Sequence, residues 1–223
     1  VKKEGWKEND LLIQSDLAKS LKLISTRGKS TFYKGEIAKK IVKDFNKNGG
    51  IFLLEDFARY EAKIRKPVCG LYRSFEVCSM PPPSSGGIAI IQILNILENF
   101  EISNYKHNSF EYVALLKEAM AYTFADRSVF LGDSDFFDVP QDKLISKDYA
   151  ALIAKNIGKE KRMEIKPGMF FEESDETTHF SIIDQWGNAV SNTYTLNGAY
   201  GSGIVAKGTG ILMNNEMDDF SIK

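Results

Sequence analysis

The sequence predicts an α+β fold in which helices come first and antiparallel strands follow. Up to about Ile157, apolar residues recur at spacings of three and four, which is typical of helices. From Thr177 on, this period gives way to short runs of β-branched and aromatic residues separated by turn formers. A chain of 223 residues with 43% hydrophobic and 26% charged residues has the composition of a globular protein with a sizeable core.

The helical part contains six segments with helical periodicity or helix start and stop signals. Gly49-Gly50 is a stop signal, and Ser84 and Ser85, after three prolines, can cap the helix that follows them. A polar link at residues 158–175 separates the last helix from the strands. We expect the helices at Leu11–Ser25, Thr31–Lys47, Leu53–Tyr60, Ile88–Phe100, Ser109–Leu131 and Ser146–Ile157.

A hairpin interrupts the helices, with strands at Val68–Tyr72 and Phe75–Ser79. If the turn lies at Arg73-Ser74, Cys69 and Cys78 face each other across the strands. A disulfide is then possible in an oxidising compartment, while two cysteines in so long a chain are usually small buried hydrophobic residues. The sequence leaves both readings open.

The second hairpin carries the most informative pattern of the chain. Its strands run over residues 177–184 and 189–195, with turn formers between them. A turn centred on Trp186 pairs residues whose numbers sum to 372, and Thr177 with Thr195 gives that sum. Opposed residues have Cβ atoms about 4.5–5.5 Å apart, so the two hydroxyls could form a hydrogen bond.

A threonine hydroxyl needs a base to become a nucleophile, and no His-Asp partner stands at a recognisable spacing. An α-amino group has a pKa of about 7.7–8.0, close to the optimum for a general base near neutral pH. Thr177 would gain that amine if the bond between Glu176 and Thr177 were cut. Self-cleavage there is therefore a hypothesis, and by themselves two threonines at the start of a strand are ordinary β-strand composition.

Charge and composition exclude several classes of function. With 29 basic and 30 acidic residues, the net charge of −1 gives no field that favours nucleic acid. Cys69, Cys78, His107 and His179 do not have the spacing of a structural metal site, and the glycines form no dinucleotide-binding motif, so we expect neither metal nor cofactor. The chain has no membrane-spanning apolar stretch and no initiator Met, and we interpret it as an internal piece of a longer protein.

Several ordered motifs resemble the gamma-glutamyltranspeptidase family of N-terminal-nucleophile hydrolases, and the resemblance runs from Glu8 to the end of the chain. It implies a four-layer αββα sandwich, of which this chain forms part. Residues 1–176 would end the large subunit, residues 177–223 would begin the small catalytic subunit, and both would belong to one composite domain. The motifs are Phe32-Tyr33-Lys34-Gly35, Met80–Gly87, Tyr122–Ser128, Thr177–Ser181, Gly187–Val190, Thr193–Asn197 and Leu212–Ser221.

The resemblance also implies roles for individual residues. Thr177 matches the nucleophile that self-cleavage releases, and Thr195 matches the threonine that hydrogen-bonds it. Asn197 matches a residue that contacts the α-carboxylate of the donor, while Glu216 and Asp219 match the positions that hold its α-ammonium. Judged without the resemblance, Asn197 begins an ordinary turn pair and the acidic residues form a solvated loop.

The implied reaction is transfer or hydrolysis of the gamma-glutamyl group of glutathione and related compounds through an ester on Thr177. Water, an amino acid or a dipeptide would be the acceptor, and the two subunits would associate as a heterodimer after cleavage. The family is usually periplasmic or secreted, and its members extend beyond both ends of this chain, so we expect this chain alone to be inactive. His179, on the same strand face as Thr177, is expected to be structural.

Three alternatives remain. A glutaryl or cephalosporin acylase and a poly-gamma-glutamate transpeptidase belong to the same superfamily, and their donors can lack a free α-ammonium. The pair Glu216 and Asp219 is the feature that distinguishes these enzymes from a glutathione hydrolase. The third alternative is a non-catalytic scaffold, which the presence of Thr177, Thr195 and Asn197 disfavours.

Overall fold

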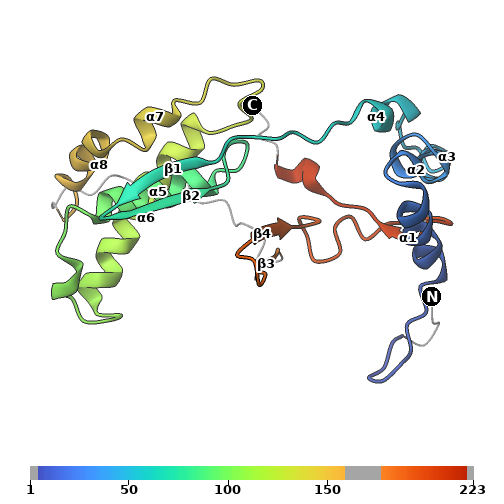
Figure 1. Cartoon of the computed structure of the whole chain (residues 1–223), viewed down its shortest axis with the longest axis horizontal. Coiled ribbons are helices and arrows are strands. Elements are labelled where there is room, and N and C mark those ends of the chain that lie inside the picture. The colour runs from blue at the N-terminus through green and yellow to red at the C-terminus, as the bar shows by residue number, and fades with distance from the viewer. Residues whose placement is uncertain (1–4, 159–176, 220–223) are drawn as a thin grey trace. The chain divides into compact units, whose positions relative to one another are not determined.

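The computed structural model describes residues 5–158 and 177–219 (Figure 1). The described residues fall into two compact units. One consists of the part of the chain before Lys63 together with the part from Thr177 on, and the other consists of residues 63–158. Helices dominate the first part of the chain and all three strand pairs are antiparallel, which confirms the predicted fold class.

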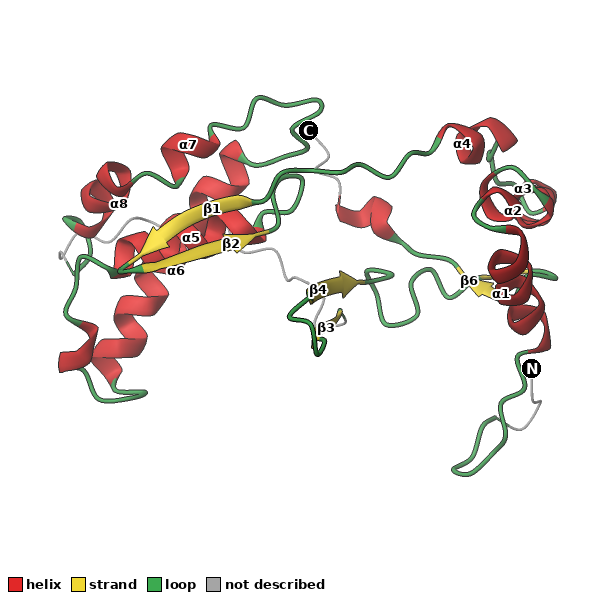
Figure 2. Ribbon diagram, in the orientation of Figure 1, coloured by secondary structure: helices red, strands yellow, loops and turns green. Residues whose placement is uncertain are grey.

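The unit of residues 63–158 is built around one apolar helix. The hairpin of β1 (Val68–Tyr72) and β2 (Phe75–Ser79) packs on α5 (Gly86–Leu97), as Figure 2 shows. Helix α5 also packs against α6 and α8, which lets it bury Ile88, Ile91 and Ile96 almost completely. The remaining elements are η1 (Ile102–Asn104), α6 (Phe110–Phe130), α7 (Gln141–Leu144) and α8 (Lys147–Ala154).

A partly buried polar cluster ties the three packed helices of this unit together. The Gln92 amide and the Tyr149 hydroxyl both donate hydrogen bonds to the carboxylate of Asp126. Burial, and then the charge of Asp126, raises the pKa of Tyr149 to about 12. The phenol therefore stays a donor at neutral pH, and the relative placement of the helices depends on hydrogen bonds as well as on apolar packing.

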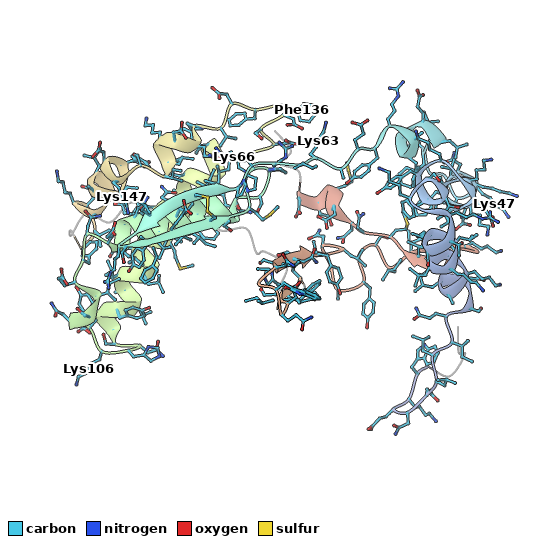
Figure 3. The ribbon with its side chains drawn as sticks, viewed as in Figure 1. Lys47, Lys63, Lys66, Lys106, Phe136 and Lys147 are labelled. Atoms are coloured by element: carbon cyan, nitrogen blue, oxygen red, sulfur yellow. A yellow bond between two sulfur atoms is a disulfide. The ribbon has the colours of Figure 1, made fainter. Side chains whose placement is uncertain are left out.

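The β1–β2 hairpin has the predicted register, with Cys69 opposite Cys78. The structure joins the two sulfurs in a disulfide, which decides the question that the sequence left open. At the far end of the hairpin, Lys147 donates to the Leu71 carbonyl oxygen and to Glu98 (Figure 3). The hairpin is thus held to α5 and α8 by side chains as well as by packing.

The other unit combines the two ends of the described chain. Its early elements are α1 (Ser15–Arg27), α2 (Ser30–Tyr33), α3 (Glu36–Lys47) and α4 (Leu54–Arg59). Its late elements are β3 (Thr178–Ile183), β4 (Ala189–Tyr194), β5 (Val205–Ala206), β6 (Ile211–Leu212) and η2 (Glu216–Asp219).

One hydrophobic cluster joins early and late elements. Ile37 and Ile41 of α3 are buried together with Ala206 of β5. Ser20 of α1 donates to the carbonyl oxygen of Thr209 at 2.7 Å, and that bond is buried. The segments on the two sides of the predicted cleavage point therefore share a core.

The structure corrects one helix prediction. Residues 31–47 form two helices rather than one, because the helical conformation is interrupted between Tyr33 and Glu36. Gly35 lies so close to the preceding turn that a Cβ atom there would stand 2.7 Å from the Cα of Thr31. The other predicted helices are present, with ends displaced by a few residues, and Ser109 and Ser146 cap α6 and α8 by accepting from backbone N–H groups.

Candidate active site

Thr177 stands at the start of the β3–β4 hairpin, which has the predicted register. Thr178 pairs with Tyr194 and His179 with Thr193, and both pairs have numbers that sum to 372. Continuing this register by one residue aligns Thr177 with Thr195. Among the described residues, Thr177 is exposed.

The turn of this hairpin is stabilised by one carboxylate. Asp184 Oδ1 accepts hydrogen bonds from the backbone N–H groups of Trp186 and Asn188, each at 2.9 Å. Its Oδ2 accepts from the Asn188 amide at 2.7 Å, and this bond, the largest of several causes, lowers the pKa of Asp184. The charged aspartate fixes the turn length and, with it, the alignment of the strands.

Thr195 and Asn197 form a tight turn directly after β4. The Thr195 hydroxyl oxygen accepts from the backbone N–H of Asn197 at 2.9 Å. Because the oxygen is the acceptor in that bond, the hydroxyl proton can be directed to another group, such as the oxygen of Thr177. Asn197 has φ of 69°, in the left-handed region that Asn tolerates better than most residues.

Asn215 connects this turn to the acidic segment, a role that the sequence analysis missed. Its side-chain oxygen accepts from the Gly198 N–H at 2.9 Å, and its backbone carbonyl oxygen accepts from the Asn197 amide at 3.3 Å. Its own amide donates to Asp218 Oδ2 at 2.8 Å. The signal available in the sequence was an Asn pair at 214–215 between a strand and an acidic cluster, but which residue it contacts depends on the fold.

Glu216 and Asp219 lie close together on η2. Desolvation first, and then the hydrogen bond to Asp219 and its charge, raises the pKa of Glu216. Two carboxyl groups in contact can share a proton or can accept a cation between them. The structure thus brings together four of the residues selected from the sequence, since Thr195 and Asn197 are linked through Asn215 to the segment that holds Glu216 and Asp219.

Other predicted features give a mixed result. Glu176 and the polar link, apart from Gly158, lie outside the described residues. The sulfurs of Cys69 and Cys78 are bonded to each other, so they cannot act as thiolate ligands of a metal. None of the described helices combines the length and apolar character that crossing a membrane requires.

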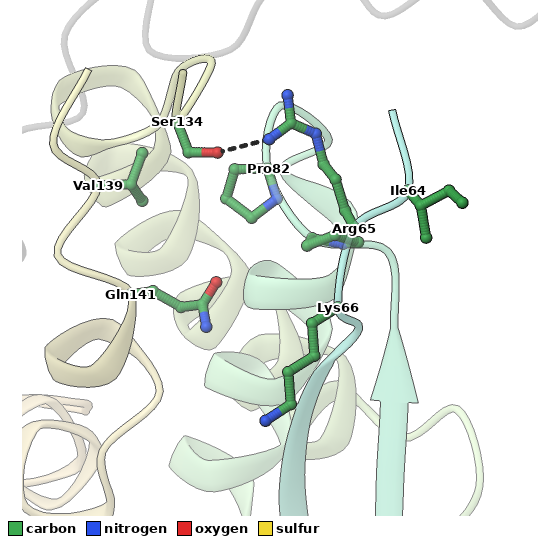
Figure 4. Close-up of a pocket in the computed structure, with 8 residues that line it drawn as sticks. Ile64, Arg65, Lys66, Pro82, Ser134, Val139 and Gln141 are labelled. Atoms are coloured by element: carbon green, nitrogen blue, oxygen red, sulfur yellow. Dashed lines mark hydrogen bonds between the residues drawn. The ribbon is translucent and has the colours of Figure 1, made fainter. Parts of the chain in front are cut away.

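A surface cavity of about 350 Å³ lies elsewhere, in the unit of residues 63–158 (Figure 4). Arg65 on its wall donates to the Ser134 hydroxyl at 3.1 Å and forms ion pairs with Asp133 and Asp135. Two carboxylates therefore neutralise this guanidinium, and the cavity is also lined by Lys66. It contains none of the residues predicted for the reaction.

Comparison with known proteins gives one consistent family. The family model described as Gamma-glutamyltranspeptidase matches residues 2–223. The chain is 51% identical to a glutathione hydrolase proenzyme of Escherichia coli over 99% of its length, which covers 39% of that protein. The chain therefore spans about two fifths of the length of this relative.

Solved structures agree. A crystal structure of the gamma-glutamyltranspeptidase of Helicobacter pylori matches 74% of this chain and 48% of its own, with 48% identity and a TM-score of 0.69. A cephalosporin acylase from Bacillus halodurans matches 92% of this chain and 37% of its own, with 30% identity and a TM-score of 0.76. The fold is thus similar to those of both kinds of enzyme.

Proposed function

Because the chain belongs to the gamma-glutamyltranspeptidase family, we propose that the full-length protein transfers or hydrolyses gamma-glutamyl groups, with Thr177 as its nucleophile. The observation that carries the proposal is the register of the β3–β4 hairpin, which aligns Thr177 with Thr195 at an exposed strand end. Glutathione is the expected donor, since the similar protein of Escherichia coli is named a glutathione hydrolase.

The first step is self-cleavage. The Thr177 hydroxyl attacks the carbonyl carbon of Glu176, the amide C–N bond breaks, and an ester forms while the nitrogen becomes an amine. Water then hydrolyses the ester, leaving a carboxylate on Glu176 and a free α-amine on Thr177. The word proenzyme in the name of the Escherichia coli relative supports this step.

The second step uses the new amine as a general base. It takes the proton of the Thr177 hydroxyl as the oxygen attacks the gamma-carbonyl of the donor, and it returns that proton to the departing amine. A gamma-glutamyl ester remains on Thr177. Water releases glutamate from it, and an amino acid or dipeptide amine forms a new gamma-glutamyl amide. Thr195 donates its hydroxyl proton to the oxygen of Thr177, which orients the nucleophile.

The donor's amino-acid head group gives the remaining residues their roles. Asn197 donates to the α-carboxylate, and the ammonium lies between Glu216 and Asp219. The proximity of these two carboxyl groups supports this role, because a bound cation would relieve their repulsion.

The shared core supports a heterodimer after cleavage. Ile37 and Ile41 precede the proposed cleavage site in the sequence and are buried together with Ala206, which follows it. Breaking one peptide bond therefore leaves their apolar contact intact. We also propose that the protein is periplasmic or secreted, and the disulfide Cys69–Cys78 supports this location because disulfides persist in oxidising compartments. Cell fractionation tests the location, and a purely cytosolic protein would contradict it.

The nucleophile is tested in the full-length protein with Thr177→Ala and Thr177→Ser. The alanine variant should stay one polypeptide by mass spectrometry and release no glutamate from glutathione. The serine variant keeps a hydroxyl and should cleave and turn over, more slowly than the wild type. Cleavage before residue 177 in the alanine variant, or unchanged activity, would refute the proposal.

A second candidate is an acylase that acts on glutaryl or cephalosporin side chains, favoured by the structural match to the cephalosporin acylase. Hydrolysis of gamma-glutamyl and glutaryl anilides by the full-length protein separates the two. We expect a preference for the gamma-glutamyl substrate that Glu216→Gln combined with Asp219→Asn reduces. A wild-type preference for the glutaryl substrate would favour the acylase instead.

A further inference from the structure

His179 lies among hydroxyl groups on one face of the β3–β4 hairpin. Its Nδ1 stands 2.6 Å from the hydroxyl oxygen of Thr193, the residue directly opposite. Its Nε2 stands 3.2 Å from the hydroxyl oxygen of Ser191 and 3.4 Å from that of Ser181. Both ring nitrogens therefore have partners within the hairpin.

These contacts lie on the same face as the nucleophile. Side chains alternate between the faces of a strand, so Thr177, His179 and Ser181 share one face of β3. Thr193 and Thr195 lie on the matching face of β4. The polar face therefore carries two paired positions, His179 with Thr193 and Ser181 with Ser191, and the register continued by one residue adds Thr177 with Thr195 at one end.

The direction of the ring argues against a role as the base. Ser181 and Ser191 stand two residues further from Thr177 than His179 and Thr193 do, toward the turn. Because Nε2 contacts these serines, the ring extends along this face away from Thr177 and Thr195. Nε2 thus has its hydrogen-bond partners on the side of the ring away from Thr177. The proton of Thr177 must therefore be taken by another group.

The contacts do have a consequence for alignment. A one-residue slip of β3 against β4 would move Thr177 to the opposite face from Thr195, because side chains alternate. In the described chain the other face of the hairpin is exposed as well, with Phe180, Ile182 and Val190 between 41% and 56% accessible. Burial of one face therefore does not hold the register within these residues, and the Asp184 turn is supported instead by a histidine bonded to hydroxyls on both strands.

The bonding pattern suits this role in every protonation state of the ring. A hydroxyl can donate or accept, so each neutral tautomer and the imidazolium find complementary partners in Thr193 and Ser191. A lysine or a carboxylate at this position would not have that property.

We propose that His179 is a positioning residue whose hydrogen bonds to Thr193 and Ser191 act with the Asp184 turn to hold the register that aligns Thr177 with Thr195. The inference rests on the proposed function of Thr177, and it assigns His179 no contact with the donor. Small errors in placing a nucleophile can reduce turnover by up to about 10²-fold. Losing these bonds should therefore slow both self-cleavage and turnover while leaving donor binding almost unchanged.

The test uses the full-length protein and four variants. His179→Phe keeps an aromatic ring without hydrogen bonds, Thr193→Val keeps the shape without the hydroxyl, and the third variant combines both changes. His179→Gln restores a donor and an acceptor at a similar reach. The rate of self-cleavage is followed by mass spectrometry, and kcat and KM are measured with a gamma-glutamyl anilide.

We expect each single variant to lower the cleavage rate and kcat by about tenfold, with KM changed less than twofold. The double variant should be no slower than His179→Phe, because that single variant already lacks the bond to Thr193. His179→Gln should stay within about threefold of the wild type. Where His179→Phe fails to fold by circular dichroism, Thr193→Val and His179→Gln decide.

Three outcomes would overturn the inference: variants equal to the wild type, losses that multiply in the double variant, or an effect confined to KM. Failure of the proposed function looks different. In that case the wild type itself would show neither cleavage before Thr177 nor turnover, whereas a failed inference leaves the wild type active.

Discussion

Gly201 and Gly203 provide a matched pair for testing how the loop after Asn197 is held. Both glycines have positive φ, 51° and 68°. A Cβ atom on Gly203 would meet no atom within 4 Å, whereas one on Gly201 would stand 2.3 Å from the carbonyl oxygen of Met213. That oxygen accepts from the backbone N–H of Ser202 at 2.9 Å and from its hydroxyl at 3.0 Å. Gly201→Ala must therefore displace a hydrogen-bonded backbone segment.

The magnitudes follow from these two environments. Left-handed backbone costs a residue with a Cβ about 1–2 kcal/mol, and both alanine variants carry that cost. Overpacking against backbone adds about 1–3 kcal/mol, and only Gly201→Ala carries it. Because 1.4 kcal/mol corresponds to a factor of ten, the excess should speed local opening about 5- to 150-fold.

Hydrogen–deuterium exchange of the full-length protein measures this opening in peptides that cover residues 198–215. Exchange should rise modestly in Gly203→Ala and much further in Gly201→Ala. Since Asn215 lies two residues beyond Met213 and bonds the Asn197 turn, Gly201→Ala should also raise the KM for the donor. Equal exchange in the two variants would show that the close approach to Met213 does not hold this loop.

Three further predictions concern covalent and ionisable groups. The Cys69–Cys78 bridge closes a loop with a sequence separation of 9, which is worth about 2–3 kcal/mol in chain entropy. A reducing agent should therefore lower the free energy of unfolding, measured in urea, by about that amount. An equal response in a variant with both cysteines changed to alanine would contradict this prediction. Desolvation, and then Asp219, raises the pKa of Glu216, so the folded protein holds a proton that the unfolded chain releases. As the pH increases from the ordinary pKa of a glutamate through the raised pKa, the stability of the protein should fall and its affinity for the donor should rise. In Glu216→Gln both dependences should flatten, and an unaltered KM profile would count against the ammonium site. Burial, and then a neighbouring carboxylate, raises the pKa of Tyr149 from 10.0 to about 12, so the hydrogen bonds of this phenol contribute fully to stability below pH 10 and are lost between pH 10 and about 12. In Tyr149→Phe, this part of the alkaline decline in the denaturation midpoint should be absent. An identical decline in the variant and the wild type would disprove the prediction.

Local patterns were sufficient for much of the fold. The two hairpins were predicted with the right register because alternation and turn residues act over a few positions, as the pairing of Cys69 with Cys78 shows. The break at Gly35 was missed because it depends on how closely the chain returns to Thr31. The two-residue strands β5 and β6 were missed because so short a segment has no periodicity.

The candidate site divides in the same way. Thr177, Thr195, Asn197, Glu216 and Asp219 were selected from motifs, and their roles stay predictions. The links from Asn215 to the Asn197 turn were not predictable, because Gly198 and Asn197 lie 17 and 18 residues away from it along the chain. The orientation of the His179 ring could not be predicted from the sequence either, since a histidine is equally suited to acting as a base and to bridging hydroxyl groups.

The sequence by itself determined which residues face each other across the β3–β4 hairpin, because the pairing follows from the turn length and the two-residue repeat of a strand. Only the tertiary structure decided that the glycine-rich segment folds back on α1 and α3, and that Asn215 holds the Asn197 turn beside the acidic segment. The physical reason is range. Hydrogen bonds and turns between near neighbours are determined by the local sequence, while contacts between distant segments depend on how the whole chain packs.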